Sequence, residues 1–440
     1  MAHRSAIHED LLNGTVRPAL VIENIGQLVT LDHADGAGRQ GPLRGADLDR
    51  ADAVEDGLVI CGGGLILAAG PRPELDGMLT EAGIRLTGAE RVDAEGKAVI
   101  PSFVDPHTHL VFGRTRQDEY ERRIRGETYL EIAAAGGGIT ASVSDLRGRS
   151  EDDLVTLGVT RVREMMAHGT GTVEVKSGYG LDLENELKML RAAGCIADLT
   201  GVRMVRTCLA AHEVPPEYRD RRRDYVDLVK EKILPAAAEG QLASRADVFC
   251  EPSVFDLAES GDILAAAQEL GLDLTVHADE LEPFGGAALA ASLGAHSADH
   301  LIMIDERGIA ALAASSTVAV LLPGTVFSLG LRSFAPARKM IAAGCAVALA
   351  SDFNPGSCPI MSMPLIMSIA CVRMRLTPAE SLAGATLNAA WALGLQNETG
   401  SLAPGKSADF LVLDLPDYRL VPYHAGHNPV AYAFLRGRRI

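Results

Sequence analysis

The 440-residue sequence predicts an α/β fold in which a (β/α)8 TIM-like barrel is flanked by a small β-sandwich domain formed by the N- and C-terminal segments. Short apolar runs alternate with longer amphipathic segments through the middle of the chain, and there are eight such runs. Both ends of the chain are instead β-rich and poor in helical periodicity. Strands that alternate with helices form a parallel sheet, and eight strands are enough to close it into a barrel.

Four runs near the ends are expected to be strands of the small domain, because they are apolar, β-branched and separated by turn residues. They lie at residues 19–31, 57–69, 407–415 and 430–440. The polar, acidic stretch 32–56 between the first two is expected to affect this domain and not the chemistry. We therefore expect a composite domain of residues 1–98 and 400–440, and a barrel of residues 99–399.

The barrel strands are expected at the eight apolar runs of the middle region. In chain order these are SFVDPHTH (102–109), TVEVKSG (172–178), RMVRTCLAA (203–211), ADVFCE (246–251), LDLTVHA (272–278), SADHLIM (297–303), STVAVLLP (316–323) and CAVALASD (345–352). Between them, residues 183–199 and 259–272 have helical periodicity, and residues 118–135 combine it with charge pairs at helical spacing. This alternation is the pattern of repeated strand–helix units.

The composition excludes several classes of function. With 58 acidic residues against 41 Lys and Arg, the net charge of −17 gives no general attraction to nucleic acid or to an anionic membrane. The N-terminus lacks the apolar region of a signal peptide, and no uncharged apolar run is long enough to span a membrane. The seven cysteines are scattered and contain no CxxC pair, which is typical of reduced thiols. We expect a cytoplasmic protein that acts on a small molecule.

Polar side chains stand at the carboxyl ends of the predicted barrel strands, where barrel enzymes carry their catalytic groups. Because a buried polar group is costly unless it is paired or bound to a metal, these positions indicate function. They are His107, His109, Lys176, His212, Glu251, His277, His300 and Asp352.

Three histidines and one aspartate in this set predict a metal site. His107 and His109 have the period-two spacing that places both imidazoles on one face of a strand. His277 ends the fifth run and Asp352 ends the eighth, so both are expected at the same mouth of the barrel. Three imidazoles and one carboxylate suit zinc or iron and leave room for water, so the sequence predicts one Zn2+ or Fe2+/Fe3+ ion.

Three residues near this site are expected to act on a water molecule. Glu280 follows His277 by three residues and is the candidate that orients the water. His300 ends the sixth run and is expected to face the same water across the mouth. Asp352 touches both metal and water in this arrangement, so it can carry a proton onward.

A second cluster is expected to bind substrate. Arg116 follows the first strand and offers a bidentate fork for a carboxylate, whereas Tyr179 stands between two glycines after the second. His212 follows the third strand. After the eighth strand, the polar loop 352–357 offers amides and side chains for a second anionic group.

With these residues in place, the sequence resembles the amidohydrolase superfamily and, within it, the imidazolonepropionases of histidine degradation. The matching stretches include PSFVDPHTHLVFGRTRQDEYERR, VEVKSGYGLDLENELKMLR, VHADEL, SADHL and ASDFNPGSCP, and together with others they cover nearly the whole chain. The resemblance implies that the predicted ligands hold one ion and that Asn354, Gly356 and Ser357 join the substrate pocket. Position 357 is Ser, a small hydroxyl residue as expected, whereas the 32–56 stretch is longer and more acidic than the family pattern.

The resemblance also implies a reaction, the hydrolysis of 4-imidazolone-5-propanoate to N-formimidoyl-L-glutamate. Many relatives hold two metals through a modified lysine at the end of the fourth strand, but that strand reads ADVFCE (246–251) and has no lysine. A single ion is therefore expected. Relatives also suggest a homodimer.

Two other readings stay open at the level of sequence. A metal-dependent aminohydrolase of a nucleobase-like ring fits the spacing of His277 and Glu280, and ammonia release would distinguish it. A non-catalytic scaffold that kept the barrel but lost its chemistry is the third reading, and metal analysis would test it. Zinc and iron are not distinguished by this ligand set.

Overall fold

The computed structural model describes residues 8–32, 41–127, 131–132 and 135–440, and it contains the expected barrel. Eight parallel strands are hydrogen-bonded in the order β13-β12-β11-β10-β9-β8-β7-β6. They are β6 (Phe103–Asp105), β7 (Thr170–Lys176), β8 (Arg203–Ala211), β9 (Arg245–Cys250), β10 (Asp273–Ala278), β11 (Ser297–His300), β12 (Val318–Leu321) and β13 (Val347–Leu349). Each coincides with one of the predicted runs, so the predicted barrel is confirmed.

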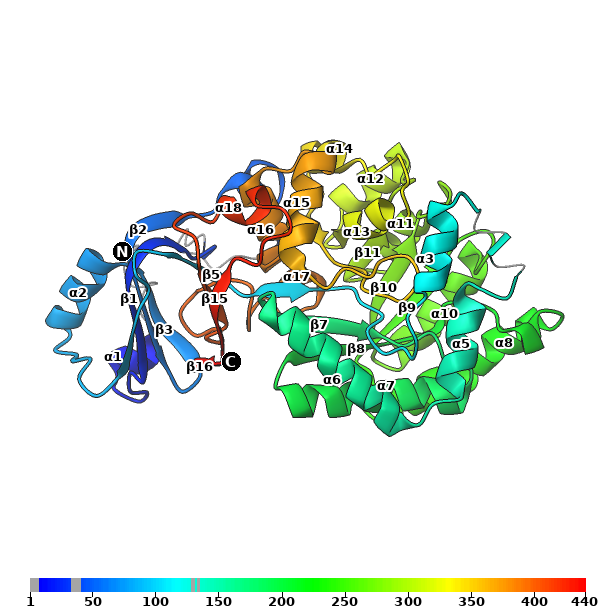
Figure 1. The fold of residues 1–440 in the computed structure, drawn as a ribbon, viewed down its shortest axis with the longest axis horizontal. Helices are drawn as coiled ribbons and strands as arrows, with labels where there is room; N and C mark the ends of the chain where they lie inside the picture. The colour runs from blue at the N-terminus through cyan, green and yellow to red at the C-terminus, as the bar shows by residue number, and fades with distance from the viewer. Residues whose placement is uncertain (1–7, 33–40, 128–130, 133–134) are drawn as a thin grey trace.

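Helices alternate with these strands and surround the barrel sheet (Figure 1). They include α3 (Gln117–Ile124), α5 (Ile139–Arg147), α6 (Glu151–Ala167), α7 (Leu183–Thr200), α8 (Arg222–Leu228), α9 (Leu234–Glu239), α10 (Leu257–Glu269), α11 (Gly286–Ser292), α12 (Glu306–Ala313), α13 (Pro323–Ser328), α14 (Ala337–Ala342), α15 (Met363–Met374), α16 (Pro378–Gly384) and α17 (Leu387–Ala392). The predicted helices 183–199 and 259–272 correspond to α7 and α10.

The helix predicted over 118–135 is interrupted. Its first part, α3, ends at Ile124, and Gly126 follows with a φ of 98°, a left-handed conformation that cannot continue a helix. Residues 131 and 132 are again helical. Residues 128–130 and 133–134 of this prediction lie outside the described residues.

The first and last barrel strands meet through residues just beyond their ends. The amide of Asp352 donates to the carbonyl of His107 at 3.0 Å, and the amide of His109 donates to the carbonyl of Phe353 at 2.9 Å. On the strand side of this seam, the amide of Ser351 donates to the carboxylate of Asp105 at 2.9 Å. The seam therefore places two predicted ligands of the first strand beside the ligand of the last.

The two ends of the chain pair in one β-rich unit beside the barrel (Figure 1). Its strands are β1 (Leu20–Val29), β2 (Ala53–Gly62), β3 (Leu65–Pro71), β4 (Glu90–Asp93), β5 (Ala98–Pro101), β14 (Phe410–Leu413), β15 (Val430–Leu435) and β16 (Arg438–Arg439). They form a single mixed sheet rather than the two sheets of a sandwich, because β5 pairs with both β1 and β14 and makes the ladder continuous.

Both faces of this sheet are buried. One face packs on the helices α1 (Glu9–Leu12) and α2 (Arg72–Glu81) through Leu11, Leu75 and Leu79. The other face encloses a cluster in which Phe410 and Phe434 stack with their ring centroids 4.6 Å apart. Aromatic pairs of this kind add stability beyond their buried area.

The expectation that residues 32–56 affect only the small domain is wrong for the described part that follows residue 40. Leu43 and Leu48 belong to the core of the barrel. Arg44 donates to the carbonyl oxygens of Ala313, at the end of α12, and of Ser315 and Gly344, in the loops that lead into the amino ends of β12 and β13. This segment therefore covers the floor of the barrel, opposite the predicted site.

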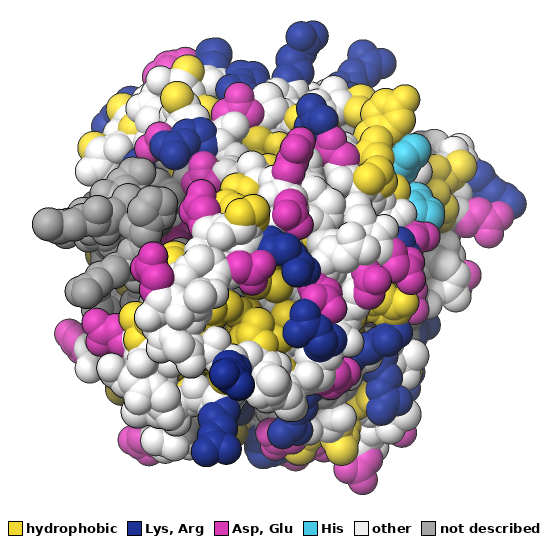
Figure 2. Space-filling model, turned by 90° about the vertical axis from the view of Figure 1, so that its left-hand side faces the viewer, with side chains coloured by type: hydrophobic (Ala, Val, Ile, Leu, Met, Phe, Trp, Pro, Cys, Tyr) yellow, Lys and Arg dark blue, Asp and Glu magenta, His cyan; other side chains and the backbone are white. Residues whose placement is uncertain are grey.

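One face of the surface agrees with the composition. Figure 2 shows the end of the molecule that carries the small sheet, where basic and acidic side chains are interspersed and no continuous basic area is seen. Among the helices of the described residues, none is both long and apolar enough to cross a membrane.

Candidate active site

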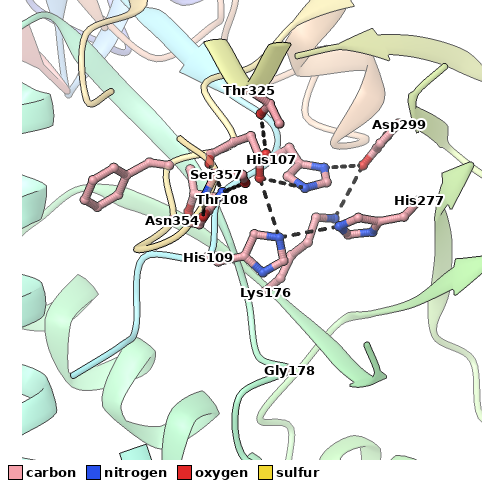
Figure 3. A network of polar contacts seen from close by, with 12 residues as sticks. His107, Thr108, His109, Lys176, Gly178, His277, Asp299, Thr325, Asn354 and Ser357 are labelled. Atoms are coloured by element: carbon pink, nitrogen blue, oxygen red, sulfur yellow. Dashed lines mark hydrogen bonds and ion pairs between the residues drawn. The ribbon is translucent and has the colours of Figure 1, made fainter. Parts of the chain in front are cut away.

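The three histidines among the predicted metal ligands lie together at the carboxyl end of the barrel (Figure 3), and Asp352 lies beside two of them. His107 and His109 follow β6, and His277 lies in β10. The Nε2 atoms of both His107 and His109 lie near Oδ1 of Asp352, at 3.6 and 3.7 Å respectively. The Nε2 atoms of His109 and His277 are 3.4 Å apart. All four side chains are buried, so the barrel brings together donors that are distant in the sequence.

A second layer of charged side chains lies behind two of these histidines. Asp299 Oδ2 is 2.6 Å from Nδ1 of His107, and Asp247 Oδ2 is 2.8 Å from Nδ1 of His277. The ammonium of Lys176 lies 2.8 Å from Asp247 Oδ2 and 3.5 Å from Asp299 Oδ2. A carboxylate on Nδ1 fixes the ring so that Nε2 faces the cluster, which is the usual arrangement behind metal-bound histidines.

The electrostatic surroundings make most of these groups ready to bind a cation. Burial is the largest cause that holds the pKa of His107 and of His109 well below its usual range, so both imidazoles are neutral. Burial also opposes the charge of His277, but Asp247 outweighs it and raises that pKa. The pKa of Asp352 is raised to about 6 by burial. Neutral imidazoles and a carboxylate are the forms that coordinate metals.

The donor geometry fits a metal ion. Within the described part of the chain, three overlapping triplets of side chains offer ligand atoms within 4.8 Å of one another, and His107, His109 and His277 each belong to two of them. The Nε2 atom of His107 is buried and makes no hydrogen bond. A buried nitrogen lone pair without a proton partner is costly unless a cation takes it. The set of imidazoles and one carboxylate suits zinc or iron.

Glu280 and His300 face each other beside this cluster. Nδ1 of His300 lies 3.6 Å from Oε1 of Glu280. The loop that carries Glu280 is held by Glu251, whose carboxylate accepts the amide of Glu280 at 2.6 Å. Burial, with the charge of Asp352, raises the pKa of Glu280 to about 8, whereas burial holds the pKa of His300 well below its usual range. Glu280 therefore has the proton affinity of a base that works near neutral pH.

Two residues of the candidate site, His300 and Asp352, have strained backbones. His300 has a φ of 75° and Asp352 a φ of 55°, which is the left-handed region that side chains disfavour. The hydroxyl of Thr325 donates to Oδ2 of Asp352 and so holds its carboxylate in place. Strain of this kind persists where the surrounding structure enforces it, and it clusters at functional sites.

The predicted substrate residues Tyr179 and His212 lie beside His109, one of the clustered histidines. The ring of His212 stacks on His109 with centroids 4.9 Å apart, and Tyr179 lies 5.8 Å from the ring of His109. Nδ1 of His212 contacts the carbonyl of Gly178 at 3.0 Å. The loop that carries Tyr179 is fixed by the buried carboxylate of Glu186, which accepts three of its backbone amides.

Arg116 stands beside the loop that follows β13. A Cβ atom added to Gly356 would lie 2.2 Å from a guanidinium nitrogen of Arg116, so a larger residue there would displace this guanidinium. Arg116 is largely buried and pairs with Glu119 at 2.7 Å, and the same carboxylate accepts the amide of Gly138. Nε of Arg116 makes no hydrogen bond. Arg116 therefore keeps a donor for a bound anion.

The loop at residues 354–357 is organised differently from our expectation. Oδ1 of Asn354 accepts the amides of Gly356 and Ser357, at 2.8 and 2.7 Å, so neither amide is free for an anion. The side-chain nitrogen Nδ2 of Asn354 donates to the carbonyl of Asp352 and to Oγ of Ser357. The hydroxyl hydrogen of Ser357 is the donor that this loop still offers.

The sequence analysis missed the residues that hold the site together. Asp247 and Asp299 each place a carboxylate inside an apolar strand, and this pattern is the signal that could have identified them. Lys176 was noticed but was given no partner. Glu119 and Glu186 lie on acidic helices, where nothing in the sequence separates a buried carboxylate from its exposed neighbours.

Comparisons with known proteins identify the family of this chain. The model of the amidohydrolase family matches residues 98–440. The imidazolonepropionase of Symbiobacterium thermophilum is 50% identical over 97% of this chain and 98% of that relative. The imidazolonepropionase of Herpetosiphon aurantiacus is 44% identical over 95% of this chain and 96% of its own.

Solved structures share the fold at lower identity. An adenosine deaminase from Xanthomonas campestris with bound zinc superimposes with a TM-score of 0.69 at 20% identity, covering 96% of this chain and 93% of that one. The guanine deaminase of E. coli has a TM-score of 0.69 at 16% identity, with coverages of 96% and 99%. The family match and the near full-length relatives decide the assignment: this chain belongs to the amidohydrolase family and, within it, to the imidazolonepropionases.

Proposed function

We propose that this chain hydrolyses the ring amide C–N bond of 4-imidazolone-5-propanoate and releases N-formimidoyl-L-glutamate. The observation that carries the proposal is the position of Arg116 beside Gly356, near the cluster of histidines and Asp352. A hydrolytic centre with an arginine beside it suits a ring amide that bears a carboxylate tail. The relatives that match nearly the whole chain carry the corresponding name.

We propose that His107, His109, His277 and Asp352 hold one zinc or iron ion. Such an ion, when bound, lowers the pKa of water and polarises a carbonyl group. The orphaned Nε2 of His107 and the neutral imidazoles support this ligand set. A second ion is not proposed, because β9 ends at Cys250 and offers no lysine to bridge two metals.

The side chains around the cluster account for the proton transfers. The oxygen of water forms a bond to the ring carbonyl carbon, the bond from that carbon to the ring nitrogen breaks, and the nitrogen takes up a proton. Glu280 accepts the proton of the attacking water, and His300 at 3.6 Å keeps its carboxylate aimed at the cluster. The proton that Glu280 takes up is then passed to the departing nitrogen by way of Asp352 or His300, the two groups that interact with Glu280.

The substrate is held by groups on the loops above the strands. Arg116 pairs with the propanoate, since a guanidinium and a carboxylate form strong charge-assisted hydrogen bonds. The hydroxyl of Ser357 donates to the same end of the substrate, and Asn354 and Gly356 shape the loop that presents it. Tyr179 and His212 stand next to His109 and border the ring.

The experiment that tests this function is an absorbance assay of purified, metal-loaded protein with 4-imidazolone-5-propanoate. Loss of the imidazolone absorbance, with N-formimidoyl-L-glutamate as the product and no ammonia, supports the proposal. Ammonia release would indicate the alternative, a deaminase of a nucleobase-like ring. No turnover by protein that holds its metal would make the substrate assignment wrong.

We further propose a homodimer that works in the cytoplasm, with a composite domain of residues 1–98 and 400–440 and a barrel of residues 99–399. The seven free cysteines support a reducing compartment. The exposed side chains of Val372 and Tyr423, each 76% accessible, support an association surface. The first proposed boundary lies at β5 (Ala98–Pro101), the strand that joins β1 to β14 and leads into the first barrel strand.

A further inference from the structure

Lys176 lies at the centre of a buried charge cluster behind the metal-binding histidines. It is the last residue of β7, and its side chain is fully buried. Its ammonium contacts three carboxylates: Glu174 and Asp247 at 2.8 Å each, and Asp299 at 3.5 Å. A buried lysine is stable only when such partners compensate its charge.

The three carboxylates do not have the same role. Asp299 contacts Nδ1 of His107, and Asp247 contacts Nδ1 of His277, so each of them orients one predicted ligand. Glu174 contacts no histidine ring and instead accepts the hydroxyl of Thr207. Lys176 thus joins two separate carboxylate–histidine pairs, one from β9 and β10 and one from β11 and the residues that follow β6. Figure 3 shows Lys176 beside Asp299, His107 and His277.

The third histidine lacks this support. Among the ion pairs of the described residues, His107 and His277 meet a carboxylate at Nδ1, whereas His109 meets one at Nε2 and its ring rests on His212. The positions of His107 and His277 relative to each other therefore depend on one ammonium, because Lys176 fixes the spacing between Asp247 and Asp299. Without it, two buried carboxylates of like charge would repel each other and turn the rings they hold.

We propose that Lys176 is a positioning residue of the metal centre: by bridging Asp247 and Asp299 it sets the spacing of His107 and His277 and thereby the affinity for the ion. The inference rests on the proposed metal site. It does not depend on the substrate, because the affinity for the ion is measured without it.

The test compares Lys176→Met with a charge-balanced double variant, Lys176→Met/Glu174→Gln. Glu174→Gln removes the carboxylate that orients no histidine, so the double variant keeps the net charge of the cluster while the bridge is absent. Lys188→Met is the matched control, because Lys188 donates to the carbonyls of Leu146 and Arg149 and contacts no ligand. Zinc affinity is measured by chelator competition, the ligand geometry by the visible spectrum of the cobalt-substituted protein, and the fold by thermal melting.

We expect the double variant to melt near the wild-type temperature but to bind zinc about 10- to 100-fold more weakly, with an altered cobalt spectrum. Lys188→Met should bind zinc within about twofold of wild type, which is the scale of an unaffected site. A double variant that retains wild-type affinity and spectrum, or one that does not fold, would overturn the proposal, since Lys176 would then serve only stability. Wild-type protein that binds no zinc or iron would instead refute the metal site itself.

Discussion

The two ends of the barrel bury polar side chains for opposite purposes. At the floor, Arg44 donates to three backbone carbonyls, and Asn388 bonds the amide and carbonyl of Leu43 and the carbonyl of Val347. At the mouth, ring nitrogens of His107, His109 and His300 are buried without hydrogen bonds. Single unpartnered atoms also occur at the floor, at Arg245 and Thr317. The site is therefore identified by several such groups that converge on one point, as the histidines at the mouth do.

The backbone shows the same contrast. His300 and Asp352, at the mouth, adopt positive φ values of 75° and 55°. Asn388 instead lies within the regular helix α17. Substitutions at the mouth should therefore change metal binding and turnover, whereas substitutions at the floor should change the free energy of unfolding.

The largest expected effect is the loss of the metal ligands. His107→Ala removes a nitrogen that no other group replaces, so we expect a loss of metal and a fall in kcat of at least about 10³-fold, since metal activation contributes several kcal/mol. Metal content by mass spectrometry and steady-state kinetics check this. A variant that retains one ion per chain and wild-type kcat would contradict the ligand assignment.

Substitution of the proposed base comes next. Glu280→Gln keeps the shape of the side chain but cannot accept a proton, so kcat should fall about 10²- to 10⁴-fold while the metal stays bound. In the wild type, kcat/KM should rise with pH as Glu280 loses its proton, with a midpoint at or below the value of about 8 set by burial and Asp352, because a cation in the site favours the carboxylate. The residual activity of Glu280→Gln should not show this rise of kcat/KM with pH. If the pH profile is unchanged, the rise is caused by another group.

Arg116→Met should produce a smaller and different effect. The loss of a charge-assisted pair with the propanoate is expected to raise KM about 10- to 100-fold and to leave metal content unchanged. Glu119→Gln is the informative companion, because it keeps Arg116 but removes its internal partner. If Arg116→Met leaves KM at its wild-type value, the substrate has no carboxylate at this position.

The smallest effect on turnover is expected at the floor. Arg44→Met leaves three carbonyl oxygens without their donor, which should lower the free energy of unfolding by about 1–3 kcal/mol. Metal content, kcat and KM should remain those of the wild type. Denaturant unfolding measures the change in the free energy of unfolding, and metal analysis and steady-state kinetics measure the other quantities. A large fall in kcat would contradict the proposed difference between the floor and the mouth.

The sequence predicted the barrel well, because eight apolar runs form a local pattern that indicates eight strands. The polar residues at the ends of these runs meet at one mouth of the barrel, where the sequence places the candidate site. The second layer was harder, since Asp247 and Asp299 have meaning only once the barrel closes and brings Lys176 between them. The floor contact of Arg44 was missed for the same reason: its partners lie more than 250 residues away along the chain.

The loop at residues 354–357 shows a different limit. Its composition indicated free amides, but only the structure reveals that Asn354 uses two of them internally. A side chain that can serve either the loop or a ligand cannot be assigned from composition, because both uses require the same polar atoms.

The central claim is that one ion at the mouth is required for opening of the imidazolone ring. Its most direct test is a titration of metal-free protein with zinc or ferrous iron, in which turnover of 4-imidazolone-5-propanoate and ammonia are followed together. The account predicts that turnover rises linearly, reaches its plateau at one ion per chain and releases no ammonia. Full turnover by the metal-free protein, or a plateau only at two ions per chain, would contradict it.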